Sequence, residues 1–158
     1  MFAPGDYVLR PLTRDDEALL WEMLYQALSV PGREAPAREI IRRPEYARYV
    51  QDWGRPADKG YVAHETNEGA LLGAVWLRDP INRTPEEAPP ELALVVRPGH
   101  RHRGIGASLL TQLVRANPSL SAVSVRVGAN SPAVRLFERF GFEVANQSAE
   151  SVVMRRAI

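Results

Sequence analysis

A turn rich in glycine, arginine and histidine stands between a predicted strand and a predicted helix, at residues 96–107 (VRPGHRHRGIGA). The first turn of a helix presents backbone N–H groups without a partner inside the helix, together with a partial positive charge. Gly104 and Gly106 would let the backbone come close to a bound group, because glycine has no side chain. The segment is therefore expected to bind an anion, most simply a pyrophosphate. The alternative is an ordinary glycine-rich turn with exposed arginines.

Two well-known phosphate-binding motifs are excluded at this turn. A dinucleotide fingerprint needs G-x-G-x-x-G and an acidic residue about 20 positions later, but position 109 is Leu and the next acid is Glu138. A P-loop needs a lysine directly after its last glycine. The one lysine of the chain is Lys59, so this motif is absent as well.

The distribution of charge also indicates a polyanionic ligand for this part of the chain. Residues 92–137 contain six arginines and no Asp or Glu, whereas residues 1–91 contain sixteen acids against eleven Arg or Lys. The net charge of the whole chain is only +1, while nucleic-acid-binding proteins usually carry a clear positive excess. We therefore expect a phosphate-rich cofactor and no nucleic acid. Chance clustering of solvated arginines is the alternative.

Length and composition exclude several other classes of protein. A chain of 158 residues suits one domain, which we expect to span residues 1–158. The absence of cysteine excludes disulfides, thiol nucleophiles and cysteine-ligated metals. His100 and His102 form a pair, but His64 is the one further histidine, so we expect no metal. No apolar run approaches the ~20 residues of a membrane span, and no signal-peptide pattern is present, so we expect a cytoplasmic protein that does not bind membranes.

Hydrophobic periodicity predicts one mixed sheet with helices packed on it. Strands are predicted at 6–12, 60–65, 70–78, 91–96, 122–127, 142–147 and 150–157, and helices at 14–28, 36–53 with an interruption at Pro44, 105–116, and from an N-cap at Ser131 to a stop at Gly141. The order strand, turn, helix, strand over residues 91–127 predicts a βαβ unit with two parallel strands.

Two motifs together resemble the GNAT superfamily of N-acetyltransferases. The run V-x-P-x-x-R-x-x-G-x-G at 96–106 is similar to its acyl-CoA signature, with Arg101, Gly104 and Gly106 at the R-x-x-G-x-G/A core. One strand downstream, residues 130–142 (NSPAVRLFERFGF) are similar to the superfamily's N-x-x-A-x-x-L-Y-x-x-x-G-F segment. The opening VLRPLTRDDEALL resembles the usual first strand and helix. The resemblance therefore covers nearly the whole chain, and residues 30–60 and 79–90 are the least constrained.

The resemblance implies an α/β (α+β) fold: a single GNAT-like domain with a mixed, mostly antiparallel sheet of about seven strands and about four helices. The sheet would splay around a notch between strands 91–96 and 122–127, where acetyl-CoA binds as cosubstrate. The backbone from about Arg101 to Ala107 would bind the pyrophosphate, and that of Val95 and Val96 would pair with the pantetheine arm. The cofactor-binding residues implied are Val95, Val96, Arg101, His102, Arg103, Gly104, Ile105, Gly106, Ala107, Asn130 and Phe137.

The reaction that the resemblance implies is direct attack of a primary amine, from a small molecule or a peptide, on the acetyl thioester. The amine must be neutral, so a base or a water chain takes its proton. We favour Glu91, at the start of the strand before the turn, as this base; the alternative is a surface carboxylate at a strand entry. Glu86 and Glu87 have weaker claims. The acidic N-terminal part would face the amine or another cationic acceptor.

Phe137 departs from the family pattern, because many members carry there a tyrosine that protonates the leaving thiolate. The side chains of Tyr25, Tyr46, Tyr49 and Tyr61 are alternative donors that the sequence does not rank. Phe137 therefore motivates a rival interpretation, a non-catalytic acyl-CoA-binding regulatory module. A nucleic-acid-binding protein built on the arginines is a weaker one. A homodimer formed through the last two strands is left open.

Overall fold

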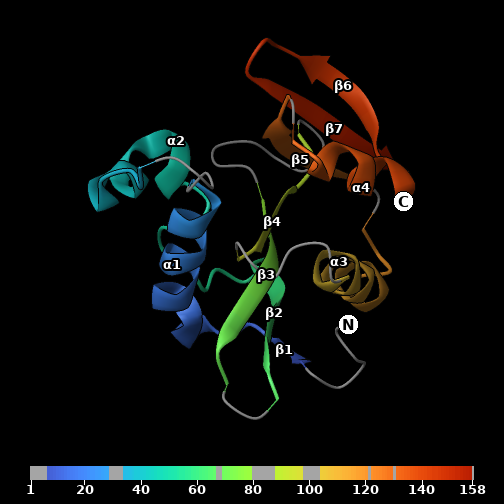
Figure 1. Cartoon of the computed structure of the whole chain (residues 1–158). Helices are drawn as coiled ribbons and strands as arrows, with labels where there is room; N and C mark the ends of the chain where they lie inside the picture. Colours follow the sequence, from blue (N-terminus) through green and yellow to red (C-terminus); the bar gives the residue numbers. More distant parts are fainter. Residues whose placement is uncertain are drawn as a thin grey trace.

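The computed structural model describes residues 7–28, 34–66, 69–79, 88–97, 104–120, 122–129 and 131–157, which form one mixed α/β domain (Figure 1). Its strands are β1 (Tyr7–Pro11), β2 (Lys59–Glu65), β3 (Leu71–Arg78), β4 (Glu91–Val96), β5 (Ala122–Gly128), β6 (Glu143–Gln147) and β7 (Ser151–Ala157). Its helices are α1 (Glu17–Ala27), α2 (Pro44–Ala47), α3 (Ile105–Ala116) and α4 (Ala133–Arg139), with 3₁₀ turns at Arg14–Asp16 and Arg38–Arg42. None of these helices is long and apolar enough to cross a membrane.

The seven described strands form one sheet in the order β1-β2-β3-β4-β5-β7-β6. Neighbouring strands are antiparallel except β4 and β5, which are parallel and joined through α3. The predicted βαβ unit and the mostly antiparallel sheet are therefore confirmed. The register of β4 and β5 holds two pairs, Glu91 with Ser124 and Leu92 with Val125. Beyond Leu92 the two parallel strands are no longer paired, so the sheet opens between them.

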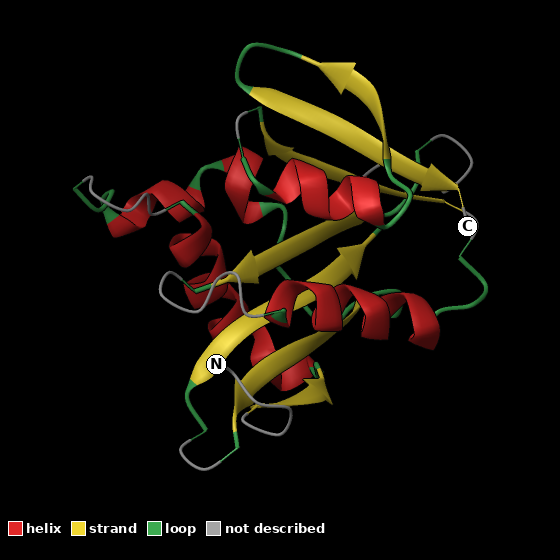
Figure 2. Ribbon diagram, turned by 45° about the vertical axis from the view of Figure 1, so that its right-hand side comes forward, coloured by secondary structure: helices red, strands yellow, loops and turns green. Residues whose placement is uncertain are grey.

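Side chains of the central strands alternate between two cores, one on each face of the sheet. On β3, Val75 and Leu77 join the core beneath α3 and α4, whereas Ala74 and Trp76 join the core beneath α1. Figure 1 shows α1 and α2 on one side of the sheet and α3 on the other. In Figure 2, α3 lies across the strands and the β6–β7 hairpin stands at one end of the molecule. The two helical layers thus cover opposite faces of the β1–β4 part.

The ends of α4 follow from its sequence. The helix begins at Ala133, one residue later than predicted, although the Ser131 hydroxyl still accepts the Ala133 N–H at 3.1 Å. Its last residue is Arg139, and after the C-cap Phe140 the chain turns away at Gly141, whose φ of +88° is a conformation that favours glycine. The N–H of Phe142 then donates to the Phe137 carbonyl at 3.0 Å, as in a Schellman motif. The predicted stop at Gly141 is confirmed.

The segment 36–53 departs most from its prediction. A helix interrupted by Pro44 was expected, but the structure has a 3₁₀ turn, the single-turn helix α2 and then further turns. Pro44 stands at the first position of α2, where its missing N–H costs no hydrogen bond. So short a helix has little stability of its own. Side-chain contacts with the sheet therefore decide the path of this segment.

Candidate active site

The N-terminus of α3 has the features of an anion site. Gly104 is its N-cap, with a φ of +81°, and the first turn carries neither a capping side chain nor an acid. The first bond back along the helix runs from the Ser108 N–H to the Gly104 carbonyl at 3.0 Å. The N–H groups of Ile105, Gly106 and Ala107 therefore have no acceptor within the helix. A Cβ placed on Gly104 would meet no described atom within 4 Å, so no described side chain fills the space beside it. The described residues therefore fit a pyrophosphate.

Packing among the described residues does not by itself require glycine at position 106. A Cβ at this position would lie 3.4 Å from Leu136 of α4 and 3.7 Å from both Leu94 and Val96 of β4. These are ordinary van der Waals distances, so a Cβ would fit between α3, α4 and β4. Its backbone N–H remains one of the three donors in the first turn of α3.

Several predicted site residues lie outside the described residues, and the structure says nothing of them. They are Arg101, His102, Arg103 and Asn130, together with His100, Glu86 and Glu87. Among the residues that are described, no group of three or more His, Asp or Glu side chains could hold a metal ion.

Two backbone hydrogen bonds show which neighbouring strand the N–H and C=O groups of each β4 residue point to. The Arg97 N–H donates to the Leu72 carbonyl at 2.9 Å, so odd-numbered β4 residues pair with β3. The Ser124 N–H of β5 donates to the Pro90 carbonyl at 2.9 Å, so the even-numbered side faces β5. The backbone groups of β4 therefore alternate between the two neighbouring strands.

This alternation changes one predicted role. The backbone groups of Leu94 and Val96 point to the side from which β5 has separated, so they are placed to pair with an extended ligand. Val95, which the sequence analysis also assigned to the pantetheine arm, directs its backbone to β3 and buries its side chain beneath α1. Leu94 therefore replaces Val95 as a candidate, while Val96 remains one.

Glu91, the predicted base, is held by two residues from the segment after α2. Its Oε1 accepts a hydrogen bond from Arg48 Nη1 at 2.6 Å, and its Oε2 accepts one from Arg48 Nη2 at 3.2 Å. The Tyr49 hydroxyl donates to the same Oε2. A carboxylate offers about four lone-pair sites, and these bonds use three of them. Among the described residues no further donor reaches the remaining site, on Oε1, and 21% of the side chain is exposed, so a water or an amine could bind there.

The environment of this cluster keeps Tyr49 protonated. Burial and the negative charge of Glu91 raise the pKa of Tyr49 well above its ordinary value. Burial lowers the pKa of Arg48 more than any single contact raises it, but the hydrogen bonds and charges of Glu91 and Tyr49 together outweigh burial, and the pKa of Arg48 is raised. A phenol whose pKa is raised holds its proton tightly. Tyr49 is therefore a hydrogen-bond donor to Glu91 and a poor proton source for a thiolate.

The structure separates the four tyrosines that the sequence could not rank. Tyr49 reaches Glu91, whereas Tyr25 donates its hydroxyl to the Pro36 carbonyl at 2.6 Å. Tyr46 packs against the core beneath α1, and Tyr61 packs against the core on the opposite face. The contact of Tyr49 joins residues 42 positions apart. No local pattern in the sequence signals it, and the role of Arg48 was missed for the same reason.

Phe137 is part of the core beneath α3 and α4. Its side chain is 1% exposed, and its ring meets that of Phe142 edge-on, with centroids 5.1 Å apart and planes at 68°. The inward orientation expected from the helical pattern is confirmed. A direct contact of Phe137 with the cofactor stays a prediction.

Comparison with known proteins agrees with this architecture. Solved structures of similar fold include an N-acetyltransferase from Staphylococcus aureus Mu50, with 15% identity, coverage of 96% of this chain and 98% of that one, and a TM-score of 0.69. The PaiA N-acetyltransferase from Thermoplasma acidophilum, in complex with coenzyme A, has 18% identity, coverage of 96% and 99%, and a TM-score of 0.65. A GNAT superfamily phosphinothricin acetyltransferase from Sinorhizobium meliloti, in complex with AcCoA, has 19% identity, coverage of 97% and 89%, and a TM-score of 0.69.

These identities are low, so the structural likeness shows the fold alone. No curated protein matches the chain. The family model described as the acetyltransferase (GNAT) family matches residues 21–142, which include β4, α3, β5 and α4. Since this match covers most of the sequence, the chain belongs to the GNAT family of acetyltransferases.

Proposed function

We propose that this protein is an acetyl-CoA-dependent N-acetyltransferase that acts on a primary amine, of a small molecule or a peptide, by direct attack in a ternary complex. One observation carries the proposal. The anion site at the start of α3 follows the end of β4, and the partly buried carboxylate of Glu91 stands at the beginning of the same strand. From Glu91 to Val96 the strand spans roughly 17 Å. An extended pantetheine arm along the open edge of β4 would bring a thioester from the anion site toward Glu91.

The residues that would bind the cofactor lie at the start of α3 and along β4. The N–H groups of Ile105, Gly106 and Ala107 bind the pyrophosphate, and the backbone of Leu94 and Val96 pairs with the pantetheine arm. One of these strand N–H groups donates to the developing oxyanion, a contact that typically contributes about 2.7–4 kcal/mol.

Glu91 removes the proton of the attacking amine. The open lone pair on its Oε1 accepts this proton directly or through a water, because the other positions on the carboxylate bind Arg48 and Tyr49. The complexes of the Thermoplasma acidophilum and Sinorhizobium meliloti proteins with coenzyme A and AcCoA support acetyl-CoA as the cosubstrate.

A non-catalytic acyl-CoA-binding module remains the rival function, and Phe137 favours it. This side chain supplies no proton donor, and the ring is buried in the core. The same arrangement is compatible with catalysis if the thiolate leaves unaided or takes its proton from water.

One experiment separates the two functions. The protein is incubated with acetyl-CoA and a panel of primary amines, including polyamines, amino acids and peptides, and the release of free thiol is followed. Release that depends on a particular amine supports the acetyltransferase. A thermal melt raised by acetyl-CoA without thiol release on the whole panel supports the module. A melt that acetyl-CoA leaves unchanged contradicts both.

A further inference from the structure

Arg78 of β3 and Asp58, which directly precedes β2, form a buried ion pair. The side chains of Arg78 and Asp58 are 6% and 2% exposed, and the Asp58 oxygens accept from Arg78 Nε and Nη2 at 3.1 Å each. Asp58 also accepts the N–H groups of Gly54 and Arg55 at 3.0 Å each. A buried ion pair often adds no net stability over apolar residues of similar volume. The geometry that this pair imposes on its surroundings is therefore the better explanation of its presence.

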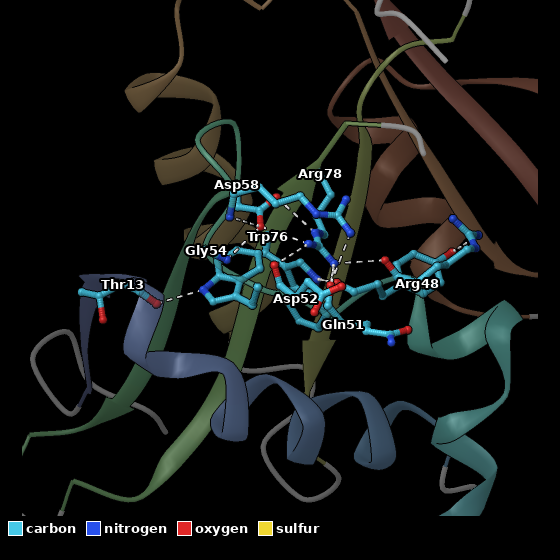
Figure 3. A network of polar contacts seen from close by, with 11 residues as sticks. Thr13, Arg48, Gln51, Asp52, Gly54, Asp58, Trp76 and Arg78 are labelled. Carbon is cyan, nitrogen blue, oxygen red and sulfur yellow. Dashed lines mark hydrogen bonds and ion pairs between the residues drawn. The ribbon is translucent and has the colours of Figure 1, made fainter. Parts of the chain in front are cut away.

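The remaining donors of Arg78 hold one turn of the backbone. Its Nη1 donates to the carbonyls of Arg48 at 3.2 Å and Gln51 at 2.8 Å, and its Nη2 donates to that of Asp52 at 3.3 Å. Figure 3 shows these carbonyls and the Asp58 carboxylate converging on the one guanidinium. Three backbone carbonyls after α2 are thus fixed to β3 by a single side chain.

The turn held in this way carries both residues that hold Glu91. The Arg48 carbonyl accepts from Arg78, and the Tyr49 carbonyl accepts from Trp76 Nε1 at 2.9 Å. The side chains of the same two residues reach the Glu91 carboxylate. Their backbones are therefore anchored on β3, and their side chains contact β4.

We propose that Arg78, together with Asp58, is a positioning residue for acetyl transfer, because it fixes the 48–52 turn from which Arg48 and Tyr49 orient the Glu91 carboxylate. The proposal rests on the proposed function of Glu91, although the anchoring itself does not depend on turnover. Without the fork of Arg78, the carbonyls of Arg48, Gln51 and Asp52 lose the donor that ties them to β3, and the turn relaxes, although Arg55 Nη2 still donates to the Gln51 carbonyl at 3.4 Å. Glu91 would stay in β4 but lose the contacts that set the direction of its oxygens. Misplacement of a reacting group by about 1 Å can lower a rate about a hundredfold.

Arg78→Lys is the decisive variant. Lysine keeps a positive charge beside Asp58 but lacks the planar fork of five donors that binds several acceptors at once. The matched control is Arg10→Lys, since Arg10 also makes a two-bond pair with an aspartate, Asp16, at 2.9 Å for each bond, but lies on the edge strand β1, two strands from β3. Trp76→Phe is a second test variant, because it keeps an aromatic ring in the core but removes the bond to the Tyr49 carbonyl, together with part of the buried ring.

The first readout needs no substrate, and it follows the ionisation of Tyr49. The charged groups that face Tyr49 are Glu91 from β4, Arg48 from its own segment and Arg126 from β5. Because the pKa of Tyr49 is raised, this phenol should stay protonated in the wild type between about pH 9 and 11, on either side of the ordinary tyrosine pKa of about 10. Wild type and Tyr49→Phe should therefore show equal tyrosinate absorbance over that range.

In Arg78→Lys, Tyr49 should become exposed and ionise in this pH range, so the tyrosinate absorbance should exceed that of the wild type by one tyrosine. The double variant Arg78→Lys/Tyr49→Phe should not show this increase. Trp76→Phe should show part of this increase and Arg10→Lys none. If folded Arg78→Lys and Trp76→Phe both titrate as the wild type does, the anchoring role is refuted.

The second readout is kinetic and uses whichever amine the panel identifies. Arg78→Lys and Tyr49→Phe should each lower kcat/KM for the amine about ten- to a hundredfold, with the KM for acetyl-CoA close to wild type. Arg78→Lys should melt at a lower temperature but still cooperatively, because buried carbonyls lose a donor. Wild-type kcat/KM in Arg78→Lys would overturn the proposal. If the wild type releases no thiol with any amine, the acetyltransferase function fails, and the titration alone then decides whether Arg78 holds the Tyr49–Glu91 contact.

Discussion

Arg78 and Glu91 stand directly opposite each other on β3 and β4, yet each is neutralised by a different residue. Arg78 pairs with Asp58, and Glu91 pairs with Arg48. A direct cross-strand pair would have joined only the two strands. The two separate pairs instead tie the whole segment between α2 and β2 to the sheet. They also leave the Glu91 carboxylate within reach of water while that of Asp58 is sealed.

Glu91→Gln tests the role of this carboxylate. An amide cannot take a proton at neutral pH, so kcat/KM for the amine should fall by about 10²–10⁴-fold if Glu91 is the base. Acetyl-CoA should still raise the melting temperature, because the anion site is at the other end of β4. Asp16→Asn, which also alters an arginine-paired carboxylate, is the control and should keep its activity. Equal activity in Glu91→Gln and the wild type would exclude Glu91 as the base.

Gly104→Asn tests the anion site at the start of α3. Asparagine tolerates a positive φ better than most residues, so the fold should persist while the side chain enters the space beside the first turn. Coenzyme A at about 100 times its Kd should stabilise the wild type by about 2.7 kcal/mol, and this gain should largely disappear in the variant. Valine is a poorer choice, because the left-handed backbone adds strain of about 1–2 kcal/mol.

Gly69→Asn is the matched control for this experiment. Gly69 also has a positive φ, +71°, with no atom within 4 Å of an added Cβ, but it precedes β3 and lies far from α3 in sequence. Its variant should respond to coenzyme A as the wild type does. Wild-type affinity in Gly104→Asn would place the pyrophosphate elsewhere.

Sequence predicted the elements around the cofactor site closely, because their signals are local. The bounds of β4 and α3 agree with the predictions, and β5 extends one residue further. In each case a run of alternating or helically spaced apolar residues ends at a glycine, a proline or a polar turn. The parallel pairing of β4 and β5 followed from the βαβ order alone.

Residues 36–53, which carry the two residues that hold Glu91, were predicted less well, because tertiary contacts determine their path. The path of residues 36–53 depends on Arg78, whose bonds to the Arg48 and Gln51 carbonyls join residues 30 and 27 positions apart. No spacing in the sequence marks such a pair. The orientation of Val95 was missed for a related reason: it depends on the register with β3, and a shift of one residue would reverse it.

Asp16 provides a prediction for the pH dependence of stability. It completes a capping box with Thr13, and its hydrogen bonds from Arg10 lower its pKa. Because the pKa of Asp16 is lower in the folded protein than in the unfolded chain, its ionised carboxylate stabilises the fold at pH values above the ordinary Asp pKa of about 3.9. This stabilisation is lost as the pH falls through the pKa of the folded protein. Asp16→Asn should therefore be less stable than the wild type at neutral pH, by about 1 kcal/mol. Urea unfolding should show this difference narrowing as the pH falls below about 4. A difference that does not change with pH would contradict the assignment.

Phe137→Tyr tests whether this core has room for the hydroxyl of the tyrosine that many family members carry at this position. The ring is 1% exposed and packs edge-on against Phe142, so a hydroxyl would be buried without a partner. The free energy of unfolding should fall by about 1–3 kcal/mol. Phe140→Tyr, at a half-buried position beside the same helix, should change it by no more than about 0.5 kcal/mol. Thiol release should not increase in Phe137→Tyr, because the hydroxyl would lie inside the core. If this variant were as stable as the wild type and released thiol faster, the para position of the ring would open toward the thioester, and a proton donor at residue 137 would be restored.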